Sequence, residues 1–236
     1  MEFYLQKGYY KLGIILGIII IIGCAQGKVA KHSRSRVGEI PAGGTIAVMP
    51  FQSLSDEKFA SGDSVRCPIC GAVFRSGVIE PNAEETLTRF FFEKLSSQGF
   101  YDVLPLDQVK DVVSGELSGD MKEFTIEKTV QVGKMLGADA VVIGFVLRYR
   151  KREGTAHSVK RPASVAFGVH MVGVKDNKLI WHGSFEETQR SLSENILELF
   201  TFFKRGRKWL TADELAEYGV DKVLKNFTNS NRQRKD

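Results

Sequence analysis

Hydrophobic and polar positions predict a folded domain from residue 45 to residue 228, beginning with a strand followed by helices. Thr45 to Phe51 is a short apolar run stopped at Pro50, which favours a buried strand. Apolar residues at helical spacing follow Asn82, which we expect to cap a helix in a capping box with Glu85; Gly99 ends this helix. Shorter helices are predicted at Leu106 to Val113 and, capped by Thr125, at Ile126 to Leu136, with Met135 mostly inward.

Later positions predict long strands and a closing helix. Ala140 to Tyr149 begins apolar on both faces, as expected for a central strand. Val165 to Val174 and Leu179 to Glu187 then predict a hairpin with Asp176-Asn177 at its tip. A capping box of Thr211 and Glu214 starts the last helix. This order predicts an α/β fold with a single mixed β-sheet of about five strands packed with helices.

A different pattern precedes this domain. Lys7 and Lys11 are followed by an apolar run from Leu12 to Ile22, the order of an export signal. A helix of that length spans roughly 16 Å, about half of the hydrocarbon core of a membrane, which argues against a permanent transmembrane helix. We therefore expect residues 1–23 to be a signal peptide.

The apolar run ends in Ile21-Ile22-Gly23-Cys24, which resembles the lipobox of bacterial lipoproteins. The resemblance implies that Cys24 is lipidated and becomes the mature N-terminus; the alternative is a signal anchor with an incidental cysteine. Ala25 stands where an aspartate would resemble an inner-membrane retention signal. We expect a lipid-anchored outer-membrane protein whose domain faces the periplasm, with the lipid bilayer as its first partner.

Polar, basic segments flank the predicted domain. Residues 24–44 combine Lys and Arg with Gly, Ser and Ala, as expected for a flexible lipidated tether, and residues 229–236 form a polar tail. The net charge of +5 includes Glu2, Lys7 and Lys11, so removal of the signal leaves about +4. So modest a charge on an exported protein argues against a nucleic-acid partner.

Three segments of the domain, in this order, resemble a known family. They are Ile46 to Phe51, Gly99 to Val103 and Leu136 to Gly144. Together they are similar to the lipoproteins of curli secretion channels and penicillin-binding-protein activators (CsgG/LpoB-like), whose fold is similar to the N-terminal domain of TolB. The resemblance implies an accessory or assembly role at the outer membrane, with another envelope protein as partner, and supplies no catalytic residues.

A secretion pore of the curli type is the alternative function, in which the chain would be a homo-oligomer. Such a pore needs amphipathic hairpins that close into a barrel. Arg148 to Gly154 is too charged to face lipid. Ser193 to Phe203 is more apolar and precedes a basic stretch, which predicts an amphipathic helix that lies on a membrane or packs on the domain.

Cys67 and Cys70 carry the most unusual chemistry of the domain. Cys67-Pro68-Ile69-Cys70-Gly71 has the spacing of a metal knuckle, in which a turn aims amide N–H groups at two thiolates. Zinc is the candidate ion and needs two more ligands, which could come from His32, His157, His170 and His182 or from a second subunit. A two-residue turn would put His170 and His182 on opposite faces of the hairpin; a three-residue turn would reverse that.

Other readings of the two cysteines stay open. A local disulfide suits an oxidising compartment. A redox-active pair is less favoured, because the motif lies in a predicted loop and not at a helix N-terminus. His170 and His182 also fit ordinary strand residues, and Arg148 and Arg150 a solvated strand end.

The sequence offers no hydrolase or phosphate-binding motif that withstands inspection. Gly62-Asp63-Ser64 echoes an esterase motif but is better explained as a turn. We therefore expect a non-enzymatic protein without a certain cofactor.

Overall fold

The computed structural model describes residues 40–41, 43–54, 64–116, 125–155, 158–189 and 209–232. Its strands are β1 (Thr45–Val48), β2 (Gln52–Ser53), β3 (Ser64–Arg66), β4 (Val73–Arg75), β5 (Asp102–Val103), β6 (Ala140–Arg150), β7 (Glu153–Gly154), β8 (Val159–Arg161), β9 (Ser164–Gly173) and β10 (Lys178–Thr188). Its helices are α2 (Ala83–Ser97), α3 (Leu106–Glu116), α4 (Ile126–Leu136) and α6 (Ala212–Arg232). Within these ranges no helix is both long and apolar enough to cross a membrane.

The main sheet is mixed and has the strand order β10-β9-β6-β1-β5. β1 runs parallel to both β5 and β6, whereas β9 is antiparallel to β6 and to β10. Beyond Pro50 the chain returns to the sheet as β2, which also pairs with β6. The predicted fold class and the central position of β6 are confirmed.

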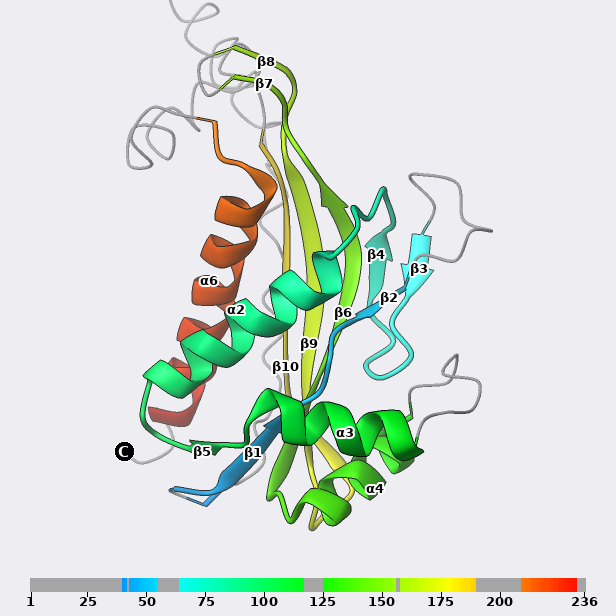
Figure 1. Cartoon of the computed structure of the whole chain (residues 1–236), viewed down its shortest axis with the longest axis vertical. Helices are drawn as coiled ribbons and strands as arrows, with labels where there is room; N and C mark the ends of the chain where they lie inside the picture. Colours follow the sequence, from blue (N-terminus) through cyan, green and yellow to red (C-terminus); the bar gives the residue numbers. More distant parts are fainter. Residues whose placement is uncertain are drawn as a thin grey trace, which may run out of the picture. The chain divides into compact units, whose positions relative to one another are not determined.

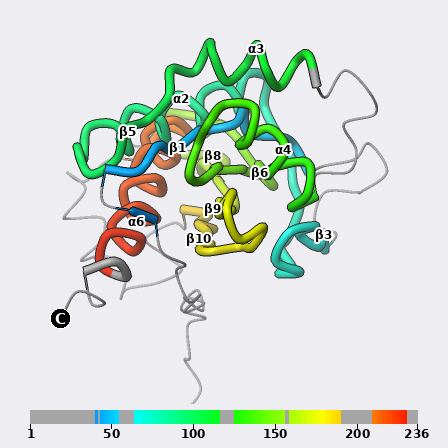
Figure 2. Tube along the Cα trace, turned by 90° about the horizontal axis from the view of Figure 1, so that it is seen from below, coloured from blue at the N-terminus to red at the C-terminus, as the bar shows by residue number. Residues whose placement is uncertain are grey.

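Each face of the sheet has its own cover. One face packs against α2 and α6, through apolar residues that include Val146 on β6 and Phe167 on β9. The other face packs against α3 and α4 near Val141 and Val172. Farther along the same strands it packs against the β3–β4 hairpin. Figures 1 and 2 show α6 and this hairpin on opposite sides of β9 and β10.

Two of the three predicted helix caps are present. Thr125 accepts a hydrogen bond from the amide of Lys128 at 3.3 Å. Thr211 and Glu214 form the reciprocal capping box, with distances of 2.8 and 3.1 Å. The capping box at Asn82 was wrong: this residue is left-handed, with φ of 65°, and its side chain makes no cap hydrogen bond. The positive φ turns its side chain away from the geometry that a cap requires.

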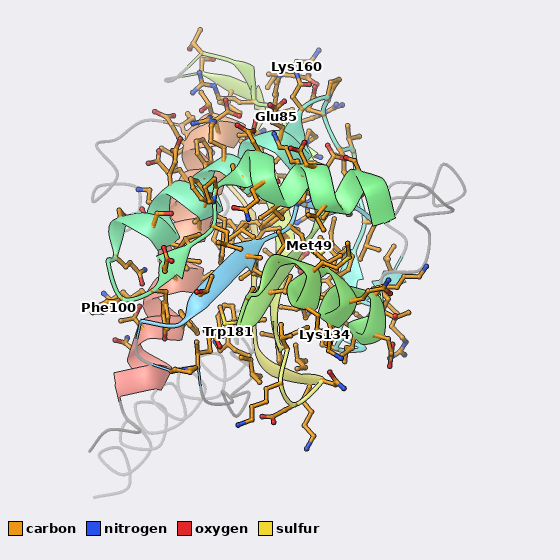
Figure 3. All side chains as sticks on the ribbon, turned by 60° about the horizontal axis from the view of Figure 1, so that its bottom comes forward. Met49, Glu85, Phe100, Lys134, Lys160 and Trp181 are labelled. Atoms are coloured by element: carbon orange, nitrogen blue, oxygen red, sulfur yellow. The ribbon has the colours of Figure 1, made fainter. Side chains whose placement is uncertain are left out.

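Some surface and loop predictions also need correction. Met135 is 53% exposed, since α4 directs other residues at the sheet. Arg148 is not a solvated strand end, because it donates hydrogen bonds to Ser164 and to the carbonyl of Arg75 and pairs with Glu186. Figure 3 shows Lys134 on the outer side of α4, Phe100 at the periphery and Met49 inside, beside β1.

The export signal, Cys24 and Ser193 to Phe203 lie outside the described residues, as do His32, His157 and nearly all of the tether. The first described strand, β1, begins at Thr45, and α6 continues to Arg232. The first residues of the predicted polar tail are therefore helical.

The caps give a matched test of local stability. Thr211→Ala removes the acceptor for the Glu214 amide and should lower the free energy of unfolding by about 1 kcal/mol. Asn82→Gly should leave it unchanged or raise it, because glycine adopts positive φ without strain. Urea unfolding of the full chain in detergent measures both, and equal losses would contradict the two cap geometries.

Candidate metal centre

A short hairpin presents the two cysteines. β3 and β4 pair antiparallel from Ser64 with Arg75 to Arg66 with Val73. In the turn between them, the amide of Cys67 donates to the carbonyl of Ala72 at 2.8 Å and that of Gly71 to the carbonyl of Cys67 at 3.0 Å. Gly71 has φ of 70°, a left-handed conformation that glycine adopts without a steric cost. The predicted loop is thus an ordered turn.

The hairpin is fixed to the sheet beside β9. Chain segments on both sides of it bond to β6: the amide of Leu54 donates to Val146 and that of Gly77 to Leu147, at 2.9 and 3.1 Å. Its buried residues Cys67 and Phe74 pack on a cluster from β6 and β9, comprising Ile143, Phe145, Leu147 and Ala166. This packing lays the cysteine turn over the middle of β9.

His170 of β9 meets both sulfurs there. Its Nε2 lies 3.3 Å from the Sγ of Cys67 and 3.1 Å from the Sγ of Cys70. The three ligand atoms all lie within 4.8 Å of one another. Sulfur and nitrogen ligands around one tetrahedral zinc lie roughly 3.3 to 3.8 Å apart, so these side chains need only small shifts to hold an ion.

The turn also supplies hydrogen bonds to the sulfurs. The amides of Ile69 and Cys70 donate to Cys67, and the amide of Ala72 donates to Cys70. This is the amide arrangement that the knuckle spacing predicts, and it stabilises thiolate charge. Both cysteines are free thiols.

The two thiols differ in acidity. The thiol of Cys67 donates a hydrogen bond to the sulfur of Cys70, which with a contact from His170 lowers the pKa of Cys70 from 9.0 to about 3. The same bond to Cys70, together with burial, raises the pKa of Cys67. One proton thus stays on the pair, on the more deeply buried sulfur.

His170 differs from an ordinary strand histidine. It is 1% exposed, and its Nδ1 is buried without a hydrogen-bond partner among the described residues. Buried ring nitrogens are normally paired, so the unpaired Nδ1 is unusual, whereas Nε2 lies within hydrogen-bond distance of both sulfurs. Its packing against Phe145 keeps the ring in place while Nε2 faces the sulfurs.

His182 lies on the same face as His170, contrary to the expectation for a two-residue turn. The hairpin has a four-residue turn at 174–177, after which Lys178 pairs with Gly173. A bulge between Leu179 and Trp181 then shifts the register, so that His182 pairs directly with His170. The two rings stack with centroids 6.3 Å apart, and burial lowers the pKa of His182.

The sequence therefore identified Cys67 and Cys70 but did not select their partner. His170 follows Cys70 by 100 positions, and only the placement of the β3–β4 hairpin on β9 joins them. The sequence does not predict the bulge, because neither Ile180 nor its neighbours are of the residue types that favour turns.

Comparisons with known proteins give structural neighbours alone. No family model and no curated protein matches the chain. A PelC dodecamer from Paraburkholderia phytofirmans is similar with 14% identity and a TM-score of 0.45, over 81% of this chain and 92% of that one. Lipoprotein GNA1162 from Neisseria meningitidis has 18% identity and a TM-score of 0.41, over 69% and 92% of the two chains.

The C-terminal domain of LpoB from Escherichia coli is also similar, with 16% identity and a TM-score of 0.39, over 65% of this chain and 88% of that one. LpoB is also named in the family resemblance that the sequence suggests. Membership of that family stays a prediction.

The acidity of the two thiols predicts selective alkylation. In chelator-treated full-length protein, iodoacetamide should modify Cys70 before Cys67, because Cys70 is the thiolate and Cys67 is buried. The rate at Cys70 should stay nearly constant from about pH 8 to 5 and fall only near its pKa, whereas an ordinary thiol slows about tenfold per pH unit.

Peptide mass mapping separates these two sites from Cys24. Cys70→Ser should abolish the fast phase and Cys67→Ser should not. A fast phase on Cys67, or equal rates, would contradict the assignment.

Proposed function

We propose that the domain is a metal-binding module in which Cys67, Cys70 and His170 hold one zinc ion. The observation that carries this proposal is the convergence of two sulfurs and one imidazole nitrogen within 4.8 Å, from segments far apart in sequence. The amide donors of the turn support it, because they stabilise negative charge on the sulfurs, and the thiolate is the form that binds a metal.

The ligand set favours zinc among common ions. Thiolates and imidazole are soft or borderline ligands, which suit zinc, whereas magnesium and calcium require oxygen ligands. A knuckle and a distant histidine are typical of a zinc site that joins two structural elements.

The role that fits this position is structural. β3 and β4 have three residues each, and an isolated two-stranded hairpin of this length is marginal in water. A metal bound by Cys67, Cys70 and His170 would fasten the hairpin to β9 and keep the centre of the sheet covered.

The segment before the domain supports a location for the protein in the cell envelope. The charged and apolar signal, Cys24 and the basic tether support a non-enzymatic lipoprotein of the bacterial outer membrane that binds another envelope protein. The family resemblance supports the same role. The pore alternative depends on Ser193 to Phe203, which lies outside the described residues.

Zinc content tests the proposed site. Full-length protein refolded with zinc and freed of excess ion should retain about one zinc per chain by mass spectrometry of the metal. Cys67→Ser, Cys70→Ser and His170→Ala should each lose most of it, while Ser64→Ala, an exposed position on the same hairpin, should keep it.

Removal of the ion should also lower stability. At a zinc concentration a thousandfold above the dissociation constant, the bound state gains about 4 kcal/mol in free energy of unfolding. If all three variants still bind about one zinc per chain, the proposal is contradicted.

Lipidation is tested separately at Cys24. A radiolabelled fatty acid should enter the wild-type protein in cells, and Cys24→Ser should abolish the label and leave the signal uncut. Cys70→Ser is the matched control and should keep the label. Labelling of Cys24→Ser would contradict the tether.

A further inference from the structure

The proposed site has three ligands, and a tetrahedral zinc takes four. This inference rests on the proposed function and asks what fills the fourth position. Among the described residues the group of His, Cys, Asp or Glu side chains whose ligand atoms converge here consists of Cys67, Cys70 and His170, with no fourth member. Either solvent completes the shell or a neighbouring side chain moves into it.

His182 is the neighbour that the fold places for this purpose. In the register of Lys178 with Gly173, His182 would pair with Val169, whose side chain packs on the α2 and α6 face. The bulge near Ile180 adds one residue to β10 and turns His182 to the face of the cysteines. Bulges redirect side chains in this way and are common beside functional sites.

The remaining distance is small. Two imidazoles that bind one tetrahedral ion at about 2.0 Å have ring centres roughly 5 Å apart. The ring centres of His170 and His182 are 6.3 Å apart, so they need to approach by about 1 Å, and His182 must also turn a ring nitrogen toward the ion. Rotation of the His182 side chain is the movement that would do this. His182 also lies close enough to Cys70 for their charges to interact.

The alternatives on this face are weaker. Ser184 is the next residue of β10 on the face, but it pairs with Gly168 and is exposed. Glu186 is paired with Arg148 at 3.2 Å. His182 is therefore the donor that suits zinc and stands beside the three ligands.

We infer that His182 is the fourth ligand, so that the ion joins the β3–β4 hairpin to two neighbouring strands of the sheet. β10 is an edge strand, and the ion would hold it by a side chain in addition to its hydrogen bonds with β9. The closed shell, with no open position for substrate, is that of a structural site.

Cobalt(II) is the probe, because its visible spectrum reports ligand number and type. Full-length wild-type protein in detergent should bind Co²⁺ with tetrahedral d–d bands and a sulfur charge-transfer band. These bands should not change when thiocyanate is added, since no position is open. His182→Gly should bind Co²⁺ roughly tenfold or more weakly and respond to thiocyanate.

Free imidazole distinguishes the loss of a metal ligand from a disturbance of the fold. Added to His182→Gly, it should restore the wild-type bands, because it occupies the space and position of the lost ligand. Ser184→Gly is the matched control and should behave like wild type. Far-ultraviolet circular dichroism establishes that both variants are folded.

The outcomes separate the two claims. If His182→Gly keeps wild-type affinity and bands while His170→Ala loses them, the fourth ligand is not His182 and the three-ligand site stands. If thiocyanate already changes the wild-type bands, the position is open and the inference is wrong. If wild-type protein shows no sulfur charge-transfer band, the metal site itself is refuted.

Discussion

The structure depends on burial of the β6–β9 strand pair on both faces. All ten residues of β9 are buried, and β6 is buried from Ala140 to Leu147. Burial of an apolar side chain contributes about 1.5 to 3 kcal/mol, so each face needs a cover along its whole length. The helices α2 and α6 cover one face, but α3 and α4 cover only part of the other.

The β3–β4 hairpin completes that second cover, and the candidate site is a consequence of its placement. Phe74 supplies the apolar contact, as part of the cluster that holds Cys67 against β6 and β9. Cys67 is then buried against His170. The proposed ion would add stability that so short a hairpin cannot obtain from its small apolar area.

The sequence predicted what depends on local patterns. Apolar runs, helical spacing and the Thr211 capping box predicted the strands of the sheet, the long helices and the central place of β6. The predicted capping box at Asn82 was wrong because the sequence pattern does not determine φ, which here is set by the turn before α2. The prediction that Met135 faces inward was wrong because one apolar residue of a short helix can face solvent at little cost in free energy.

The site was predictable only in part for the same reason. The cysteine spacing is local, so Cys67 and Cys70 could be named. The choice of His170 required the position of the hairpin on β9, and the choice of His182 required a bulge that reverses the face of β10. If the two sulfurs and the imidazole bind one ion, X-ray absorption at the zinc edge of the metal-loaded full-length protein should show two sulfur ligands at about 2.3 Å and nitrogen ligands at about 2.0 Å. A shell of oxygen and nitrogen alone, or a Cys67–Cys70 disulfide in protein that binds no zinc, would contradict it.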